Sequence, residues 1–432
     1  GFYTYRVGMG GPVFGGVLVL DSLALVTRLG VLTLGLFTLG LLPGAAPQRH
    51  SAEYVAVILF ALAGFTLMAA AQQLLLVFLG IELASLSLYI LAGFDKTRPE
   101  SAEAALKYFL FGGMAAAFLL FGFSLLYGLT GSIELRQIAG MLHTGAGGPL
   151  LSVALVMVIV AFGFKAAAAP FHLWAPDVYE GAPTASSALI ASASKLAGFA
   201  LFARLFWNGL DPVAGSVSTV EGAPGWLPAV AVISAASMLL GNFGALAQSN
   251  VRRLLAYSAI AHAGNLLLGV IAAGHSGWAP LFYYAATYGL ATVGAFGVLA
   301  VVERTGPAEN LSDLAGLSRR SPLLAACLAI FILSLAGIPP LAGFFGKFTV
   351  FATALQLGGI SGPAGWLAIL AIGLSALALY YYLIVLKQAF VAAPMPGAQR
   401  IVVPPVAKLT LLIAAGLIVL FGICPSLLLG QF

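Results

Sequence analysis

Long apolar segments separated by short polar stretches follow one another along nearly the whole chain. A membrane-spanning helix needs about 20 consecutive apolar residues. The sequence therefore predicts an all-α polytopic membrane protein with about twelve spans. They cover approximately residues 20–42, 53–71, 73–94, 101–128, 150–176, 184–208, 226–248, 252–273, 278–302, 321–357, 364–389 and 405–429.

Two of these spans contain proline breaks. Pro170 interrupts the segment 150–176, and Pro339-Pro340 interrupts 321–357. Proline has no N–H and cannot continue the helical hydrogen-bond ladder. In hydrocarbon the freed backbone groups must be satisfied by neighbouring helices, side chains or a wet cavity. Since 321–357 is too long for one straight crossing, we expect two half-helices there.

Ionisable residues recur at similar spacing around the two breaks. Glu82 and Lys165 lie 83 residues apart, and His262 and Lys347 lie 85 apart. Transporters built from inverted repeats place their sites near the midplane, at discontinuous helices. The sequence therefore predicts two inverted five-helix repeats. The expected divisions are 1–52 (N-terminal segment and first visible span), 53–209 (first repeat), 210–390 (second repeat) and 391–432 (C-terminal span).

Two other stretches fall outside this pattern. Residues 1–19 are glycine-rich and are predicted to be a loop or an extraneous end. Because the chain begins with Gly1 and not Met, we expect a missing N-terminal piece. The polar segment 303–320 is predicted to form a short helix along the membrane surface.

Composition excludes several classes of protein. Only 8% of the residues are charged and 61% are hydrophobic, whereas soluble domains carry about 25% charged residues. The cysteines Cys327 and Cys424 stand alone in apolar runs, so we expect no iron–sulfur or zinc ligation by this chain. No glycine-rich nucleotide fingerprint follows a strand-like run. We therefore expect no cofactor in the chain and no binding of nucleic acid.

The distribution of basic residues predicts the orientation. By the positive-inside rule, loops rich in lysine and arginine face the cytoplasm. Alternate loops hold most of them, whereas the opposite loops hold Arg6 and Arg136, with Arg204 near a span end. Both visible termini are then predicted to lie outside. The cytoplasmic set is Arg49, Lys96, Arg98, Arg252, Arg253, Arg304, Arg319, Arg320, Arg400 and Lys408.

Ionisable residues inside the predicted spans or at their breaks are the candidate functional residues. A charged residue at a helix centre costs about 3 kcal/mol on insertion scales and marks a functional site by default. Buried lysine can release its proton, and histidine titrates near neutral pH, so together they permit a proton relay. The candidates are Glu82, Lys107, Lys165, His172, Lys195, His262 and Lys347.

Structural roles are the alternative for several candidates. Glu82 would then pair with Lys165 or Lys107 as a buried ion pair, and Lys107 would snorkel to the cytoplasmic side. His262 would be a satisfied core histidine, and His172 would cap the broken helix. Among the remaining charges, Asp177 and Glu180 are expected at the membrane edge as loop anchors, and Asp21 is expected to pair with Arg28.

Two motifs carry a family resemblance. The stretch FHLWAPDVYEGAPT (171–184) and the segment EAALKYFLFG (103–112) resemble subunit N of NADH:quinone oxidoreductase. This subunit is one of the antiporter-like membrane subunits of respiratory complex I, which are shared with multi-subunit Na⁺/H⁺ antiporters. Lysine at Lys347, where glutamate would be expected in subunit M, argues against M. The chain ends at Phe432 without the long lateral helix typical of subunit L.

The resemblance implies roles for the candidates. Glu82 and Lys165 resemble the coupling pair of the first half-channel, Lys195 the connecting lysine and Lys347 the lysine of the second half-channel. Lys107, His172 and His262 also match family positions. The family has fourteen spans, so the resemblance implies two more before the twelve visible here.

The resemblance also implies the setting. The chain would be a proton-pumping subunit of a translocase in the bacterial plasma membrane, beside M-like and K/J-like subunits. FMN, iron–sulfur clusters and quinone would belong to partner subunits. Two alternatives remain: a cation/proton antiporter subunit of the Mrp type, and a non-conducting scaffold of the membrane arm.

Overall fold

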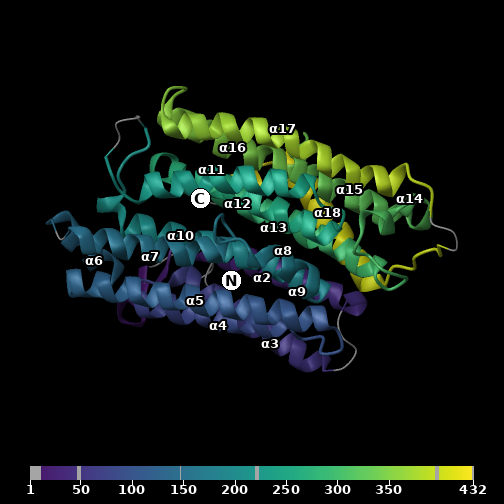
Figure 1. The fold of residues 1–432 in the computed structure, drawn as a ribbon, viewed down its shortest axis with the longest axis horizontal. Helices are drawn as coiled ribbons and strands as arrows, with labels where there is room; N and C mark the ends of the chain where they lie inside the picture. The colour runs from purple at the N-terminus through teal and green to yellow at the C-terminus, as the bar shows by residue number, and fades with distance from the viewer. Residues whose placement is uncertain (1–10, 46–49, 146, 219–222, 395–397, 431–432) are drawn as a thin grey trace.

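Helices make up almost all of the computed structural model, which describes residues 11–45, 50–145, 147–218, 223–394 and 398–430. The long helices run side by side along the long axis of the molecule (Figure 1). The first half contains α2 (Ser22–Ala45), α3 (Ser51–Ala70), α4 (Leu74–Ala92), α5 (Pro99–Thr130), α6 (Leu135–His143), α7 (Pro149–Ala166), α8 (Trp174–Gly181), α9 (Thr184–Ala191) and α10 (Ala193–Gly209).

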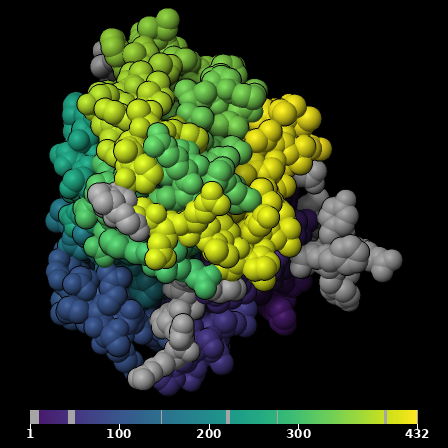
Figure 2. Space-filling model, turned by 90° about the vertical axis from the view of Figure 1, so that its right-hand side faces the viewer, coloured from purple at the N-terminus to yellow at the C-terminus, as the bar shows by residue number. Residues whose placement is uncertain are grey.

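The second half continues the bundle and lies alongside the first (Figures 1 and 2). It contains α11 (Trp226–Leu246), α12 (Val251–Ser276), α13 (Ala279–Val302), α14 (Leu317–Arg320), α15 (Pro322–Ala336), α16 (Ala342–Gly358), α17 (Pro363–Phe390), α18 (Pro405–Ile423) and α19 (Ser426–Leu429). Short 3-10 turns are η1 (Phe14–Gly16), η2 (Asp211–Val213) and η3 (Leu311–Leu314).

The predicted spans are confirmed as helices. Among the described residues, eleven helical segments are long and apolar enough to cross a membrane. The remaining predicted span, 321–357, consists of the two half-helices α15 and α16, as its length required. The boundaries of the predicted repeats remain predictions.

The centre of the bundle is formed by α9–α10, α12 and α13. In these helices, between 94% and 100% of the residues in the most apolar stretch are buried within the chain. The corresponding share is 33% for α5 and for α17. Outer helices therefore present apolar side chains to the surroundings, as a lipid-facing surface requires. The central helices carry Lys195 and His262, which places these two candidates in the protein interior.

The predicted span 184–208 is not one continuous helix. Ser192 separates α9 from α10 with φ −115° and ψ −82°. Its hydroxyl donates to the carbonyl oxygen of Ala188 at 2.6 Å, a back-bond that weakens the helical ladder and bends helices. Proline predicts the first two breaks from sequence, but this third interruption contains no proline and was not predicted.

The start of the fold differs from the predicted loop. Residues predicted to be a loop form an antiparallel hairpin of β1 (Gly11–Val13) and β2 (Leu18–Leu20). The hairpin docks on the turn between α3 and α4, where the Gln72 N–H donates to the carbonyl of Val17 at 3.0 Å. Residues 1–10 of the predicted loop lie outside the described part of the chain.

Two short surface elements complete the fold. Helix α6, which the sequence analysis did not predict, buries Leu135, Ile138 and Leu142, at the i, i+3, i+7 spacing of one helical face. The segment 303–320 forms η3 and α14, in agreement with the predicted short helix. Asn310 and Asp313 start η3 with reciprocal side-chain caps, which satisfy its first N–H groups.

Candidate functional site

The first break places Lys165 inside the protein. Helix α7 ends one residue after Lys165, because Ala167 adopts the left-handed conformation with φ 54° and ψ 43°. The Ala169 N–H donates to the hydroxyl of Ser237 at 2.8 Å, and the carbonyl of Phe164 accepts from the Ala167 N–H at 2.9 Å and from the indole of Trp174 at 3.2 Å. The break is therefore satisfied by packing, as membrane depth demands.

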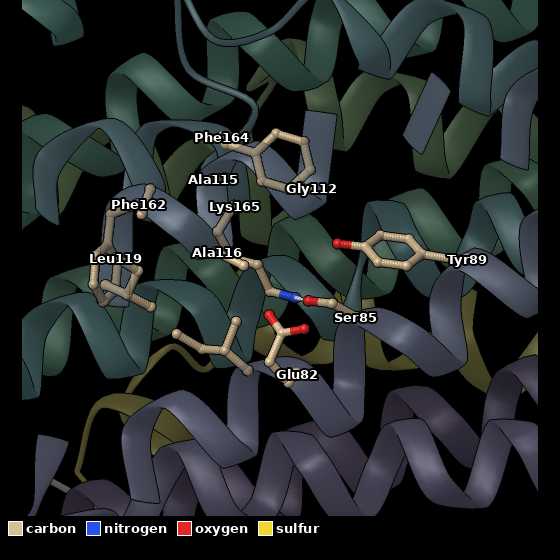
Figure 3. A pocket seen from close by; sticks show the side chains of 12 residues that line it. Glu82, Ser85, Tyr89, Gly112, Ala115, Ala116, Leu119, Phe162, Phe164 and Lys165 are labelled. Carbon is tan, nitrogen blue, oxygen red and sulfur yellow. Dashed lines mark hydrogen bonds between the residues drawn. The ribbon is translucent and has the colours of Figure 1, made fainter. Parts of the chain in front are cut away.

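Glu82 and Lys165 face each other across a small cavity (Figure 3). The Lys165 amine donates to the Ser85 hydroxyl at 3.1 Å, and Glu82 and Lys165 attract each other through their charges. Ser85 follows Glu82 by three residues and so lies on the same face of α4. The cavity has a volume of about 20 Å³, which is enough for one water molecule.

Lys195 lies at the centre of the bundle. Its side chain is 3% exposed, and its amine donates to the carbonyl oxygen of Ala259 on α12 at 2.5 Å. The amine also lies 5.8 Å from the centre of the Tyr288 ring, within the range of a cation–π contact. Lys195 therefore has a neutral oxygen and an aromatic face around its amine.

His262 also packs against Tyr288. The two rings are 4.7 Å apart. His262 Nδ1 lies 2.7 Å from the hydroxyl of Tyr284, and Nε2 lies 3.1 Å from the hydroxyl of Tyr382. His262 also lies within electrostatic range of Lys195 and Lys347. The structure thus brings these three candidates together.

The second break is bridged by Lys347. Gly337 ends α15 with φ 89°, a left-handed conformation that favours glycine. The Lys347 amine donates to the carbonyl oxygen of Ala336 at 3.0 Å. A cavity of about 290 Å³ reaches Lys347 between α16 and α17, and its rim includes Phe348 and Ile372, which are exposed. Lys347 is therefore buried but reachable through an apolar opening.

Lys107 lies apart from the buried candidates. Its side chain is 37% exposed, and its amine forms ion pairs with Glu103 and Asp177, both at 2.6 Å. Arg253 binds the other oxygen of Asp177 at 2.7 Å and also binds Glu180 at 2.7 Å. This cluster ties α5, α8 and α12 together at one end of the bundle. Asp177 and Glu180 thus connect helices by ion pairs, but they lie on α8 and not in a loop as predicted.

The pKa of the Asp177 carboxyl is lowered by its surroundings. Burial by itself would raise the pKa of the Asp177 carboxyl, but hydrogen bonds from Lys107 and Arg253 outweigh it and hold that pKa below its ordinary value. The carboxylate is therefore charged at neutral pH and stabilises both cations.

His172 lies at the first break, with the backbone of Pro170 as a hydrogen-bond partner. It lies between α7 and α8, and its Nδ1 is buried without a hydrogen-bond partner among the described residues. The hydrogen bonds of the described residues do not join it to Lys165. The structure therefore does not bring His172 into the cluster around His262.

The predicted pair of Asp21 and Arg28 is wrong. Asp21 binds Arg204 instead, which donates to both carboxylate oxygens at 2.9 and 2.6 Å. Arg204 is fully buried and donates a third hydrogen bond to the carbonyl of Ala69 at 2.9 Å. A fixed bidentate fork of this kind suits arginine, and it joins the start of α2 to α10.

Comparison with known proteins gives the family. A sequence profile described as "NADH:quinone oxidoreductase/Mrp antiporter, TM" matches residues 71–377, which include all seven candidate residues. NADH-quinone oxidoreductase subunit N 2 of Acidobacterium capsulatum is 52% identical over 426 residues, covering 96% of this chain and 85% of that protein. The chain belongs to the subunit N family of NADH:quinone oxidoreductase. Subunit N 1 of Solibacter usitatus is 39% identical over 99% of this chain and 86% of that protein.

Solved structures agree with membership of the subunit N family. A chain of respiratory complex I from Thermus thermophilus with bound aureothin is 36% identical, with a TM-score of 0.81 over 99% of this chain and 90% of that chain. A chain of the Mrp complex from Dietzia sp. DQ12-45-1b has a TM-score of 0.83 over 96% of this chain and 83% of that chain, at 23% identity. At that identity the Mrp likeness shows the shared antiporter-like fold alone.

In this member of the subunit N family, the sequence analysis missed the polar partners of the candidates. Ser85, Tyr284 and Tyr382 each contact a candidate side chain. Only Ser85 carried a local signal, because it follows Glu82 by three residues. The tyrosines come from distant segments of the sequence. Among the described residues, no group of three His, Cys, Asp or Glu side chains could hold a metal ion.

Proposed function

We propose that this chain is a proton-translocating membrane subunit of an NADH:quinone oxidoreductase. The observation that carries the proposal is the burial of three lysines, two beside the proline breaks and one beside the interruption at Ser192, in a chain of the subunit N family. The lysines are Lys165, Lys195 and Lys347. A subunit that only filled space in the membrane arm would have no use for them.

The partners of the three lysines support proton transfer. Each amine donates to a neutral oxygen: a hydroxyl for Lys165, and a backbone carbonyl for Lys195 and Lys347. Buried charges are normally paired with an opposite charge. An amine that faces a neutral acceptor in a low-dielectric site can lose its proton when no carboxylate holds the charge in place. Such an amine can therefore take up and release a proton during turnover.

The positions of the buried titratable groups support stepwise proton transfer between them. Glu82 attracts the proton on Lys165. If Glu82 moves or becomes neutral, Lys165 loses that stabilisation and releases its proton towards the interior. Lys195 and Lys347 both lie within electrostatic range of His262, and the three groups would carry the proton on, with waters between the side chains. Lys107 and His172 enter this proposal by resemblance alone.

The redox chemistry would lie outside this chain. FMN, iron–sulfur clusters and the quinone site are expected in partner subunits. The neighbours would be other membrane subunits of the complex, M-like on one side and K/J-like on the other. This chain would convert a conformational or electrostatic signal into proton transfer from the cytoplasm to the outside.

The chain is a multi-pass membrane protein, and its finer placement is part of the proposal. The basic residues at one end of the bundle support a cytoplasmic location for that end. Both visible termini would then lie on the outer side of the bacterial plasma membrane.

Two other functions are less well supported. An antiporter subunit of the Mrp type would have the same fold, but the relatives with high identity are subunit N proteins. A non-conducting scaffold would not need buried lysines at both breaks.

The test is Lys165→Met in the assembled complex, in sealed membrane vesicles. NADH:quinone turnover and proton uptake are recorded together, and complex content is measured on a native gel. We expect normal assembly with a collapse of both activities. Normal turnover and proton uptake would overturn the proposal and favour the scaffold.

A further inference from the structure

A row of hydrogen-bonded polar side chains extends from His262 towards the end of the bundle that carries Arg252 and Arg253. It begins at the Tyr382 hydroxyl, 3.1 Å from His262 Nε2, and continues to the Ser258 hydroxyl at 2.5 Å from that of Tyr382. All three side chains are buried. This row does not contain Lys195 or Lys347. We call this second row of polar groups, which starts at His262, the branch.

The branch continues along α17. Tyr381 and Tyr382 are consecutive, and their rings lie 4.6 Å apart. The Tyr381 hydroxyl donates to the side-chain oxygen of Asn242 at 3.1 Å, and the Asn242 amide donates to the carbonyl of Met238 at 2.7 Å. Three helices, α11, α12 and α17, therefore contribute polar groups to one buried path.

The members of the branch lie progressively nearer to the end of the bundle that carries Arg252 and Arg253. His262 lies eleven residues from the start of α12 and Ser258 seven, while Asn242 lies four residues from the end of α11. At 1.5 Å per residue these positions are about 16, 10 and 6 Å from the helix ends. The branch thus extends from His262 towards the basic surface and ends at Asn242, about 6 Å from the end of α11.

The groups in the branch are suited to proton transfer. A hydroxyl can donate one hydrogen bond and accept another at the same time. Buried hydroxyls are also costly unless they have partners, and apolar residues of similar size would avoid that cost. Phenylalanine at position 382 would fill the same space without the hydroxyl.

We propose that Tyr382 and Ser258, with Tyr381 and Asn242 beyond them, form a proton path between the basic surface and His262. This inference rests on the proposed function. In the entry direction His262 carries its proton on Nδ1 and offers the Nε2 lone pair to Tyr382. Nε2 takes the Tyr382 proton, the Tyr382 oxygen takes the Ser258 proton, and Ser258 takes one from a hydronium ion that enters from the basic surface and is left as water. Each hydroxyl ends with one proton, and His262 gains one.

The test uses the assembled complex in sealed vesicles with Tyr382→Phe. This change removes one hydroxyl and leaves the ring packed against Tyr381. Since a positioned acid–base group is worth a factor of about 100 or more, we expect NADH-driven proton uptake to fall by about tenfold at least. The solvent deuterium isotope effect on turnover should rise above that of the wild type, because proton transfer becomes limiting.

The control is Tyr283→Phe. Tyr283 is also buried, and its hydroxyl donates to the carbonyl of Phe421 at 2.7 Å, outside the branch. We expect its uptake and isotope effect to match the wild type. If both tyrosine variants lose activity equally, or if Tyr382→Phe behaves as the wild type, the proposed path is wrong.

Ser258→Ala provides an independent check should Tyr382→Phe fail to assemble. We expect the same raised isotope effect, and the double variant should be no worse than Tyr382→Phe because both groups act in one path. Normal uptake and isotope effect in Ser258→Ala would contradict the proposal. Lys165→Met separates the two ideas: if it abolishes pumping while the branch variants pump normally, the path is wrong and the proposed function stands.

Discussion

Lys347 donates a hydrogen bond to the carbonyl oxygen of Ala336 at 3.0 Å, across the break in its own span. Ala336 is the last residue of α15, and Lys347 lies in the second turn of α16. The amine thus satisfies a carbonyl that the broken helix leaves free. The Lys347 side chain therefore links the end of α15 to α16 and places a titratable amine at membrane depth.

Lys347→Arg separates these two roles. Arginine keeps the positive charge and can still donate to Ala336, but it does not release its proton in proteins. We expect the complex to assemble while proton uptake in vesicles falls by about tenfold or more. The matched control is Lys387→Arg on the exposed face of α17. It should change neither the assembly of the complex nor proton uptake. Normal uptake in Lys347→Arg would show that Lys347 acts only as a fixed charge.

Ser85→Ala tests the contact beside the first break. The change removes the hydroxyl that accepts from Lys165, and we expect a loss of stability of about 1 kcal/mol. Because the adjacent cavity can admit a water in place of the hydroxyl, proton uptake should fall less than in Lys165→Met. The measurements are thermal unfolding in detergent and uptake in vesicles.

Ser87→Ala is the control for Ser85→Ala. Ser87 lies on the same helix, and its hydroxyl donates to the carbonyl of Leu83 at 2.7 Å, within α4 itself. We expect wild-type uptake from Ser87→Ala. Equal losses in the two variants would mean that a serine in α4 matters only for packing.

Asp177→Asn should change the dependence of stability on pH. Ion pairs hold the pKa of Asp177 below its ordinary value, so its contribution is fully present above about pH 4 and is lost as pH falls through the lowered pKa. We expect the variant to unfold at a lower temperature than the wild type at pH 7, with the difference shrinking on acidification. Glu103→Gln, at an exposed partner of Lys107, should have a smaller effect. A difference that grows towards low pH would contradict this account.

Asp21→Asn should destabilise the end of α10 that carries Arg204. It leaves the buried guanidinium of Arg204 without its carboxylate, and losing one partner of a fully buried pair costs roughly 3–5 kcal/mol. Since Asp21 itself is 38% exposed, we expect about 2 kcal/mol in thermal unfolding. Arg28→Gln removes the partner that the sequence suggested and should leave stability almost unchanged. The reverse ranking would restore the pair predicted from sequence.

The local sequence was sufficient for the spans and for the family. Hydropathy predicted the helices because each span must bury its backbone hydrogen bonds and expose apolar side chains to lipid. Proline identified the breaks at Pro170 and Pro339-Pro340, since the missing N–H acts within one turn. The interruption at Ser192 was missed because a serine back-bond is common in membrane helices and leaves no distinct local pattern.

Partners of the buried groups were decided only by tertiary structure. Arg204 binds Asp21 from 183 positions away, and His262 binds tyrosines of α13 and α17. Such pairs depend on which helix faces pack together, and hydropathy along one helix does not contain that information. The sequence by itself determined a chain of apolar helices that carries titratable residues at its breaks. Packing decided which oxygen each amine meets, because hydrogen bonds reach only about 3 Å and must be made between neighbouring helices.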